Sequence, residues 1–209
     1  MIKEREKKVH LLKVELFCEA ALKNFIGGFG LDWLDEVKAK IKRKNKILFS
    51  KDSEYLSDLA LLLGEQNHRT AVLWALNLGS KTAGKLEAKY PGEKRPKEAI
   101  EAAKLWAFGK IKMPSARRAI LDCHAFAKEL SAPEDIALCH AVGQAASVVH
   151  TEGHAFGLPI YELTSLVYEL GTENCRDAVE KKKAEYIDKV FYWKERSESY
   201  GGWAGFMLK

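Results

Sequence analysis

The most informative segment of the chain reads Cys139-His-Ala-Val-Gly-Gln-Ala-Ala-Ser-Val-Val-His-Thr-Glu-Gly-His-Ala155. From Ile136 to Val149 it is small or apolar on nearly every side of a helix, which is typical of a helix enclosed by other helices. Ala and Gly side chains also allow neighbouring helices to approach closely. The segment therefore predicts a central helix in a closely packed helical protein.

Three polar residues, His140, Gln144 and Ser147, interrupt this helix at spacings of four and three, which places them on one face. An unpaired polar group in a packed interior costs about 1–3 kcal/mol. We therefore expect a hydrogen-bonded network, a pocket wall, or both. The residues expected to line it are His140, Gln144, Ser147, His150, His154, His124, Trp106 and Tyr161.

The rest of the chain also follows a helical rather than a strand period. Asn67 and Asp52 are predicted N-caps, Ser131 and Glu134 a capping box, and Gly171 a helix end. The sequence predicts an all-α protein, a compact multi-helix bundle of roughly eight or nine helices with no sheet. The expected helices cover residues 3–24, 31–44, 52–63, 67–89, 96–107, 114–130, 131–149, 159–171 and 174–196.

Length and composition favour one globular domain. The 209 residues are 47% hydrophobic and 30% charged, and no linker is long enough to divide them. We expect a single helical domain over residues 1–209, with basic N-terminal helices (1–64) packed on a core (65–209). No apolar stretch approaches the roughly 20 residues of a membrane span, and residues 1–10 lack the apolar centre of a secretory signal. The expectation is a cytoplasmic protein without membrane contact.

The four cysteines, Cys18, Cys123, Cys139 and Cys175, are widely spaced and form no C-x-x-C pair. They are expected to be buried free thiols rather than structural zinc ligands.

A short internal repeat occurs in two of the predicted helices. Ile120-Leu-Asp-Cys-His-Ala125 recurs sixteen residues later as Ile136-Ala-Leu-Cys-His-Ala141. It indicates either close stacking of two similar helices or chance similarity between Ala-rich segments.

A metal site is the sharpest chemical alternative at the histidines. His150 and His154, at i and i+4, could face one ion, with His140 or His124 completing the set. However, Glu152 stands one place away from the H-E-x-x-H pattern. The sequence also contains no G-x-S-x-G elbow and no Gly-rich phosphate loop with its Lys. We therefore expect no catalytic residue, no metal and no cofactor, which favours a non-enzymatic protein without deciding the question.

A basic run occupies the end of the second predicted helix, residues 31–44, and extends two residues past it. The net charge of +5 arises entirely in residues 1–50, which hold 12 Lys+Arg against 7 Asp+Glu. The candidate basic patch comprises Lys38, Lys40, Lys42, Arg43, Lys44 and Lys46. It could contact phosphates, or it could be a solvated helix face. Because residues 51–209 are balanced at 22 against 22, an extended basic footprint is missing and nucleic acid is not the expected partner.

The C-terminal segment Tyr200-Gly-Gly-Trp-Ala-Gly-Phe-Met-Leu208 is too apolar for a solvated tail. Burying Trp or Phe is worth about 1.5–3 kcal/mol. Trp203 and Phe206 are therefore expected to dock on the bundle or, in a homodimer, on a second subunit.

Residues 68–168 resemble the putative immunity protein family, small helical domains assigned to bacterial toxin–immunity systems. The resemblance rests on four blocks: His68-Arg-Thr-Ala-Val-Leu-Trp-Ala75, Arg95-Pro-Lys-Glu-Ala-Ile-Glu-Ala-Ala-Lys-Leu-Trp-Ala107, residues 116–127 and residues 140–155. It implies an all-helical fold and neutralisation of a cognate toxin, and it transfers no catalytic residue.

Three functions follow in order of expectation. The first is a non-enzymatic, immunity-like protein that binds and neutralises a toxin or another protein. Because this chain is basic, a nuclease toxin, whose own binding surface is basic, would be an awkward partner. The alternative is a small-molecule-binding or metal-dependent hydrolytic protein using His140–His154. The third is a nucleic-acid binder acting through Lys38–Lys46.

Overall fold

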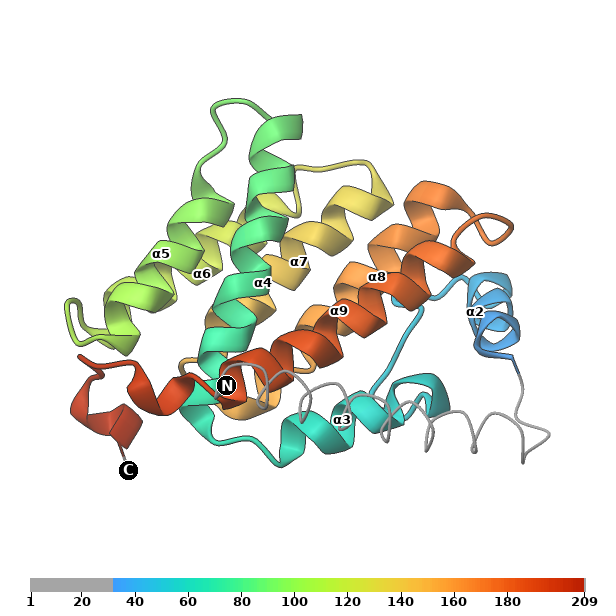
Figure 1. Ribbon diagram of the computed structural model, residues 1–209. Coiled ribbons are helices and arrows are strands. Elements are labelled where there is room, and N and C mark those ends of the chain that lie inside the picture. Colours follow the sequence, from blue (N-terminus) through green and yellow to red (C-terminus); the bar gives the residue numbers. More distant parts are fainter. Residues whose placement is uncertain (1–31, 209) are drawn as a thin grey trace.

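The computed structural model describes residues 32–208, and these residues form eight α-helices and four short 3₁₀-helices without any strand (Figure 1). The predicted all-α bundle is therefore confirmed. The predicted helix over residues 3–24 and Cys18 lie outside the described residues. The α-helices are α2 (Trp33–Lys42), α3 (Ser57–Gly64), α4 (His68–Lys89), α5 (Arg95–Ala107), α6 (Met113–Phe126), α7 (Pro133–Ser147), α8 (Gly157–Leu170) and α9 (Arg176–Lys194). The 3₁₀-helices are η1 (Glu54–Leu56), η2 (Glu152–His154), η3 (Ser197–Ser199) and η4 (Gly205–Leu208).

Helices α4 and α7 form the centre of the bundle. Helix α4 packs against α5, α7 and α9, whereas α7 contacts α4, α5, α6 and α8 (Figure 1). The close approach of α4 to α7 depends on Gly79, where an added Cβ would lie 2.6 Å from the Cβ of Ala145. The small-residue helix predicted from the sequence is thus enclosed on several sides.

Local signals set several helix ends as expected. The side chain of Asn67 accepts a hydrogen bond from the backbone N–H of Thr70 at 2.9 Å and caps α4. Helix α8 ends before Gly171, whose φ of +74° lies in the left-handed region that favours glycine.

Two predicted N-caps are wrong. Pro133 takes the first position of α7, so the residue before it, Ala132, is the N-cap and has no side-chain oxygen to offer. The expected capping box of Ser131 and Glu134 does not form. Asp52 does not start a helix either, because the 3₁₀ turn η1 comes first and its N-cap is Ser53.

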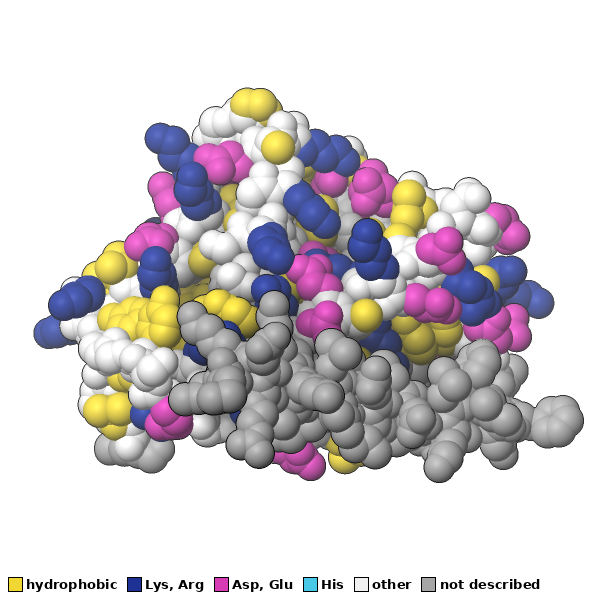
Figure 2. Space-filling model, viewed as in Figure 1, with side chains coloured by type: hydrophobic (Ala, Val, Ile, Leu, Met, Phe, Trp, Pro, Cys, Tyr) yellow, Lys and Arg dark blue, Asp and Glu magenta, His cyan; other side chains and the backbone are white. Residues whose placement is uncertain are grey.

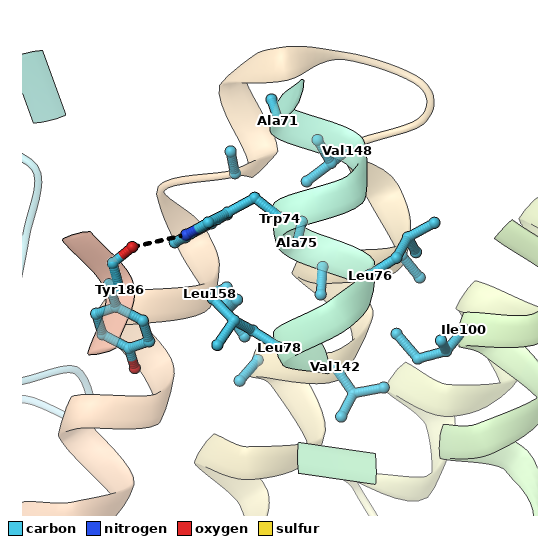
Figure 3. Packing of buried hydrophobic residues seen from close by; sticks show 14 of the residues in the cluster. Ala71, Trp74, Ala75, Leu76, Leu78, Ile100, Val142, Val148, Leu158 and Tyr186 are labelled. Atoms are coloured by element: carbon cyan, nitrogen blue, oxygen red, sulfur yellow. Dashed lines mark hydrogen bonds between the residues drawn. The ribbon is translucent and has the colours of Figure 1, made fainter. Parts of the chain in front are cut away.

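The core is built around Trp74 of α4, which is fully buried. Its indole N–H donates to the backbone carbonyl of Tyr186 in α9 at 2.9 Å, and the two rings meet edge to face (Figure 3). Leu78, Val142 and Leu158, from α4, α7 and α8, belong to the same buried cluster (Figure 3). This cluster joins four helices in one apolar interior.

A buried ionic network adds to this core. Glu162 of α8 is fully buried and accepts hydrogen bonds from the hydroxyls of Thr82 at 3.0 Å and Tyr186 at 2.9 Å. Its carboxylate also pairs with the ammonium of Lys182 at 3.0 Å. A buried carboxylate needs such partners, since an unpaired one is far more costly than a neutral polar group. The network therefore ties α4, α8 and α9 together.

The C-terminal tail folds back on α5. Trp203 is buried and stacks on Phe108 with ring centroids 4.9 Å apart, as expected for docking on the bundle. Phe206 differs from the expectation. Its ring lies 5.4 Å from that of Trp106 and so contacts the bundle, but it stays 40% exposed.

No helix within residues 32–208 is long and apolar enough to cross a membrane.

Candidate functional site

The polar stripe of α7 lies against α6, α8 and η2, and its residues are only partly buried. Nδ1 of His140 lies 3.1 Å from Nδ1 of His124 in α6, and its ring lies 5.2 Å from that of Tyr161 in α8. His140 is thus held between two neighbouring helices through polar and ring contacts.

Gly143 makes room for this histidine pair. A Cβ added to Gly143 would lie 2.4 Å from Cε1 and 2.5 Å from Nε2 of His124, far closer than any real contact. The imidazole of His124 therefore rests directly on the backbone of α7. Only glycine at position 143 allows this approach without movement of the ring.

The remaining stripe residues form two separate contacts. Oε1 of Gln144 accepts a hydrogen bond from Nδ1 of His154 at 2.8 Å. The hydroxyl of Ser147 donates to the carbonyl of Gly143 in its own helix at 2.8 Å. A Ser hydroxyl has one proton, so that of Ser147 is already used within the helix.

His150 does not join the His140 group through any direct contact within the described residues. It is exposed, and its ring stacks on Trp106 of α5 at 6.2 Å. The sequence-predicted residues thus separate into His124–His140–Tyr161, Gln144–His154 and His150–Trp106. Among residues 32–208, no three His, Cys, Asp or Glu side chains are placed to hold a metal ion.

Burial lowers the pKa of His140 below its ordinary value. Burial, together with repulsion from positive charge on His140 and His154, lowers the pKa of His124. Burial and nearby His150 lower the pKa of His154 in the same way. These imidazoles are therefore neutral near pH 7, and a neutral imidazole has one donor and one acceptor nitrogen. In the His124–His140 pair one Nδ1 donates and the other accepts.

Identical residues of the internal repeat lie in contact with each other. The thiols of Cys123 and Cys139 lie 3.8 Å apart, and each approaches the carbonyl of the other residue, at 3.6 and 3.0 Å. The next residue in each copy is the histidine of the pair described above. Cys123, Cys139 and Cys175 are buried free thiols, as predicted. Hydrogen bonding with Cys139 and burial raise the pKa of the Cys123 thiol, which keeps it protonated.

The basic run does not form one uninterrupted patch. The ammonium of Lys40 pairs with Glu36 at 2.7 Å, and that of Lys38 lies 3.5 Å from Glu173. Helix α2 ends at Lys42, and Lys44 has a φ of +61°, so the last positions leave the helix. The exposed members are Lys38, Lys42, Arg43, Lys44 and Lys46.

One histidine near the end of α7 was not singled out from the sequence as a site residue. Nε2 of His68, at the start of α4, lies 2.7 Å from the carbonyl of Val148 at the end of α7. Its Nδ1 lies 4.0 Å from the carboxylate of Glu152. No local pattern signals these contacts, because His68 is 80 residues from Val148.

No curated protein and no solved structure matches the chain. The family described as Imm-5 like putative immunity protein matches residues 61–189, which includes nearly all of the segment from α3 to α9. Because this match covers more than half of the 209 residues, the chain belongs to the Imm-5 like putative immunity protein family.

Proposed function

We propose that this chain is a non-enzymatic, cytoplasmic immunity protein that binds a cognate toxin and neutralises it. The observation that carries the proposal is the family match over residues 61–189. We also propose that residues 1–209 form one helical domain.

Close packing of the bundle supports a role in protein binding. Glycines at two helix contacts leave no space for a methyl group: Gly79 faces Ala145, and Gly143 faces His124. Side chains in such an interior are held in fixed positions. A surface carried by these helices is already ordered before binding, so association loses less conformational entropy.

Co-expression tests the proposal directly. Each protein encoded beside this gene would be produced in a sensitive bacterium with and without the full chain. We expect the chain to restore growth against one of them and to co-elute with it as a complex in gel filtration. An unrelated toxin of similar potency serves as the control and should remain lethal. Failure to bind or neutralise any neighbouring product would contradict the proposal.

A second function is favoured by a specific arrangement. His124, His140 and Tyr161 are partly exposed and converge from α6, α7 and α8, so a small molecule or metal ion could contact them. Such a protein would act as a small-molecule binder or a metal-dependent hydrolase. One zinc, iron or manganese atom per purified chain, together with a shift of the His140 imidazole resonances on removal of the metal, would support this alternative. Unchanged resonances and a metal-free chain would oppose it.

A further inference from the structure

Helix α6 has an inner and an outer face of different character. Helix α6 packs against α5 and α7 (Figure 1), and its buried residues include Ala116, Ile120 and Cys123. Arg117 and Leu121, four residues apart, lie on the opposite side and are exposed. Within residues 32–208, the helices against which α6 packs most extensively, α5 and α7, both lie on its inner side.

Positive charge is concentrated on this face and on the loop before it. Residues 110–128 hold five Lys+Arg and one Asp. That acid, Asp122, lies 3.6 Å from the guanidinium of Arg118, while the next acid along the chain, Glu129, is occupied by Arg95 at 2.6 Å. Of the five cations in residues 110–128, four have no ion pair with an acid of the described residues: Lys110, Lys112, Arg117 and Lys128.

The surface over α4, α5 and α9 is different. Figure 2 shows cations and acids intermingled there. Lys81 pairs with Glu185 at 2.6 Å, and Lys97 lies 3.4 Å from Glu87. Residues 110–128 differ in their ratio of charges, because only one acid accompanies their five cations.

Two large apolar side chains stand among these cations. Leu121 is 51% exposed and Met113 is 41% exposed. Protein–protein interfaces typically combine apolar contacts at the centre with a polar rim. A phosphate backbone would use the cations but would leave Leu121 and Met113 without apolar partners.

We infer that the outer face of α6, centred on Arg117 and Leu121, is the surface that docks an acidic protein partner. The inference rests on the proposed function and assigns its binding surface. Unpaired cations attract an acidic surface over several ångströms and speed association. Leu121 and Met113 then lose contact with water in the complex, which contributes to the lifetime of the bound state.

The test uses the full chain and, as the probe, the neighbouring-gene product that it neutralises. The dissociation constant would be measured for wild type, Arg117→Glu and Leu121→Ala at low and at physiological salt. We expect Arg117→Glu to raise it about 10-fold or more and to weaken its dependence on salt. Leu121→Ala should raise it by about 5-fold or more at both salt concentrations.

Matched controls come from other faces. Lys85 is an exposed lysine of α4, and Leu61 of α3 is 72% exposed. Lys85→Glu and Leu61→Ala make the same kinds of change away from α6, and both should bind within about 2-fold of wild type. All four variants alter exposed side chains, so their melting temperatures should stay close to that of wild type, which would separate a binding effect from misfolding.

The outcomes separate the inference from the proposed function. If wild type neutralises its partner and both α6 variants bind equally well, the docking face is overturned and the proposed function stands. If wild type binds none of the neighbouring products, the proposed function fails and the inference fails with it. Arg117-dependent binding to a short DNA duplex or to phosphatidylglycerol vesicles, without a protein partner, would overturn the inference in favour of another polyanion.

Discussion

Substituting Gly143→Ala tests the contact on which the α6–α7 packing depends. The new Cβ would lie 2.4 Å from Cε1, 2.5 Å from Nε2 and 3.0 Å from Nδ1 of His124. Comfortable carbon contacts are about 3.5–4.0 Å, so the imidazole must move by about 1 Å or more. Its 3.1 Å contact with His140 constrains that movement. The ring must therefore give up this hydrogen bond or push α6 away from α7.

The magnitude follows from three effects. Overpacking a core costs about 1–3 kcal/mol, and losing the hydrogen bond between His124 and His140 costs about 0.5–1.5 kcal/mol. Ala is a better helix former than Gly, and this difference offsets up to about 1 kcal/mol of the lost stability. We expect Gly143→Ala to lower the free energy of unfolding by about 1–3 kcal/mol and the melting temperature by about 2–10 °C.

Chemical denaturation and thermal melting would measure the change. Gly84→Ala is the matched control, because it lies in helix α4 and a Cβ there meets nothing within 4 Å. It should stabilise the protein by up to about 1 kcal/mol. In the double variant His124→Ala/Gly143→Ala the combined loss should be smaller than the sum of the single losses. Additive losses, or a Gly143→Ala protein as stable as wild type, would refute the assignment of the strain to the His124 ring.

Three further predictions concern other parts of the fold. The folded-state pKa values of His124, His140 and His154 are depressed, so the unfolded chain takes up protons at higher pH than the folded chain. The contribution of these histidines to stability should be complete above about pH 6.5 and should fall as the pH drops towards the folded-state pKa values. We expect a lower urea midpoint at about pH 5.5 than at about pH 7.5. An unchanged midpoint over that interval would contradict this. Replacing Glu162 by Ala should lower the free energy of unfolding by about 3–5 kcal/mol in the same assay. The change removes the buried carboxylate that accepts from the Tyr186 hydroxyl and leaves the largely buried ammonium of Lys182 with Glu185 alone, at 2.9 Å. A loss below about 1 kcal/mol would show that water replaces the pair. Replacing Trp203 by Ala should lower the free energy of unfolding by about 1.5–3 kcal/mol, because the buried ring no longer stacks on Phe108. Equal melting temperatures for the variant and wild type would mean that the ring is not docked in solution. Light scattering would show whether the tail also joins two chains.

Helix positions were predictable where the signal is local. Asn67 at the start of α4 and Gly171 after α8 act through their own backbone neighbours, so the sequence is sufficient to predict them. The capping box failed for a reason that is also local. Pro133 and Ser131 compete to define the start of α7, and the fixed φ of proline prevails.

Contacts between distant segments were only partly predictable. The polar stripe of α7 was visible from its spacing, but its partners were not. Glutamate is usually exposed on a helix, so nothing local predicts that Glu162 is buried. Its burial depends on Lys182 and Tyr186 in the next helix. The internal repeat contains two matching Cys-His pairs, but the sequence does not show that the two cysteines and the two histidines contact each other. Such pairings depend on how α6 crosses α7, and no helical period contains that information.

The two faces of α6 are connected by this packing. On the inner side, the His124 ring rests on the backbone of Gly143, which has no side chain. This direct contact sets the distance between α6 and α7. On the outer side, Arg117 and Leu121 are carried by the same helix. A helix that cannot approach or tilt without a clash holds its outer residues in a fixed position, and a fixed surface loses less entropy on binding. The partly exposed histidines then need no ligand to account for their place in the fold. We expect them to act as the spacer that positions α6, so that a ligand at His140 or a substitution at Gly143 would change the outer face as well.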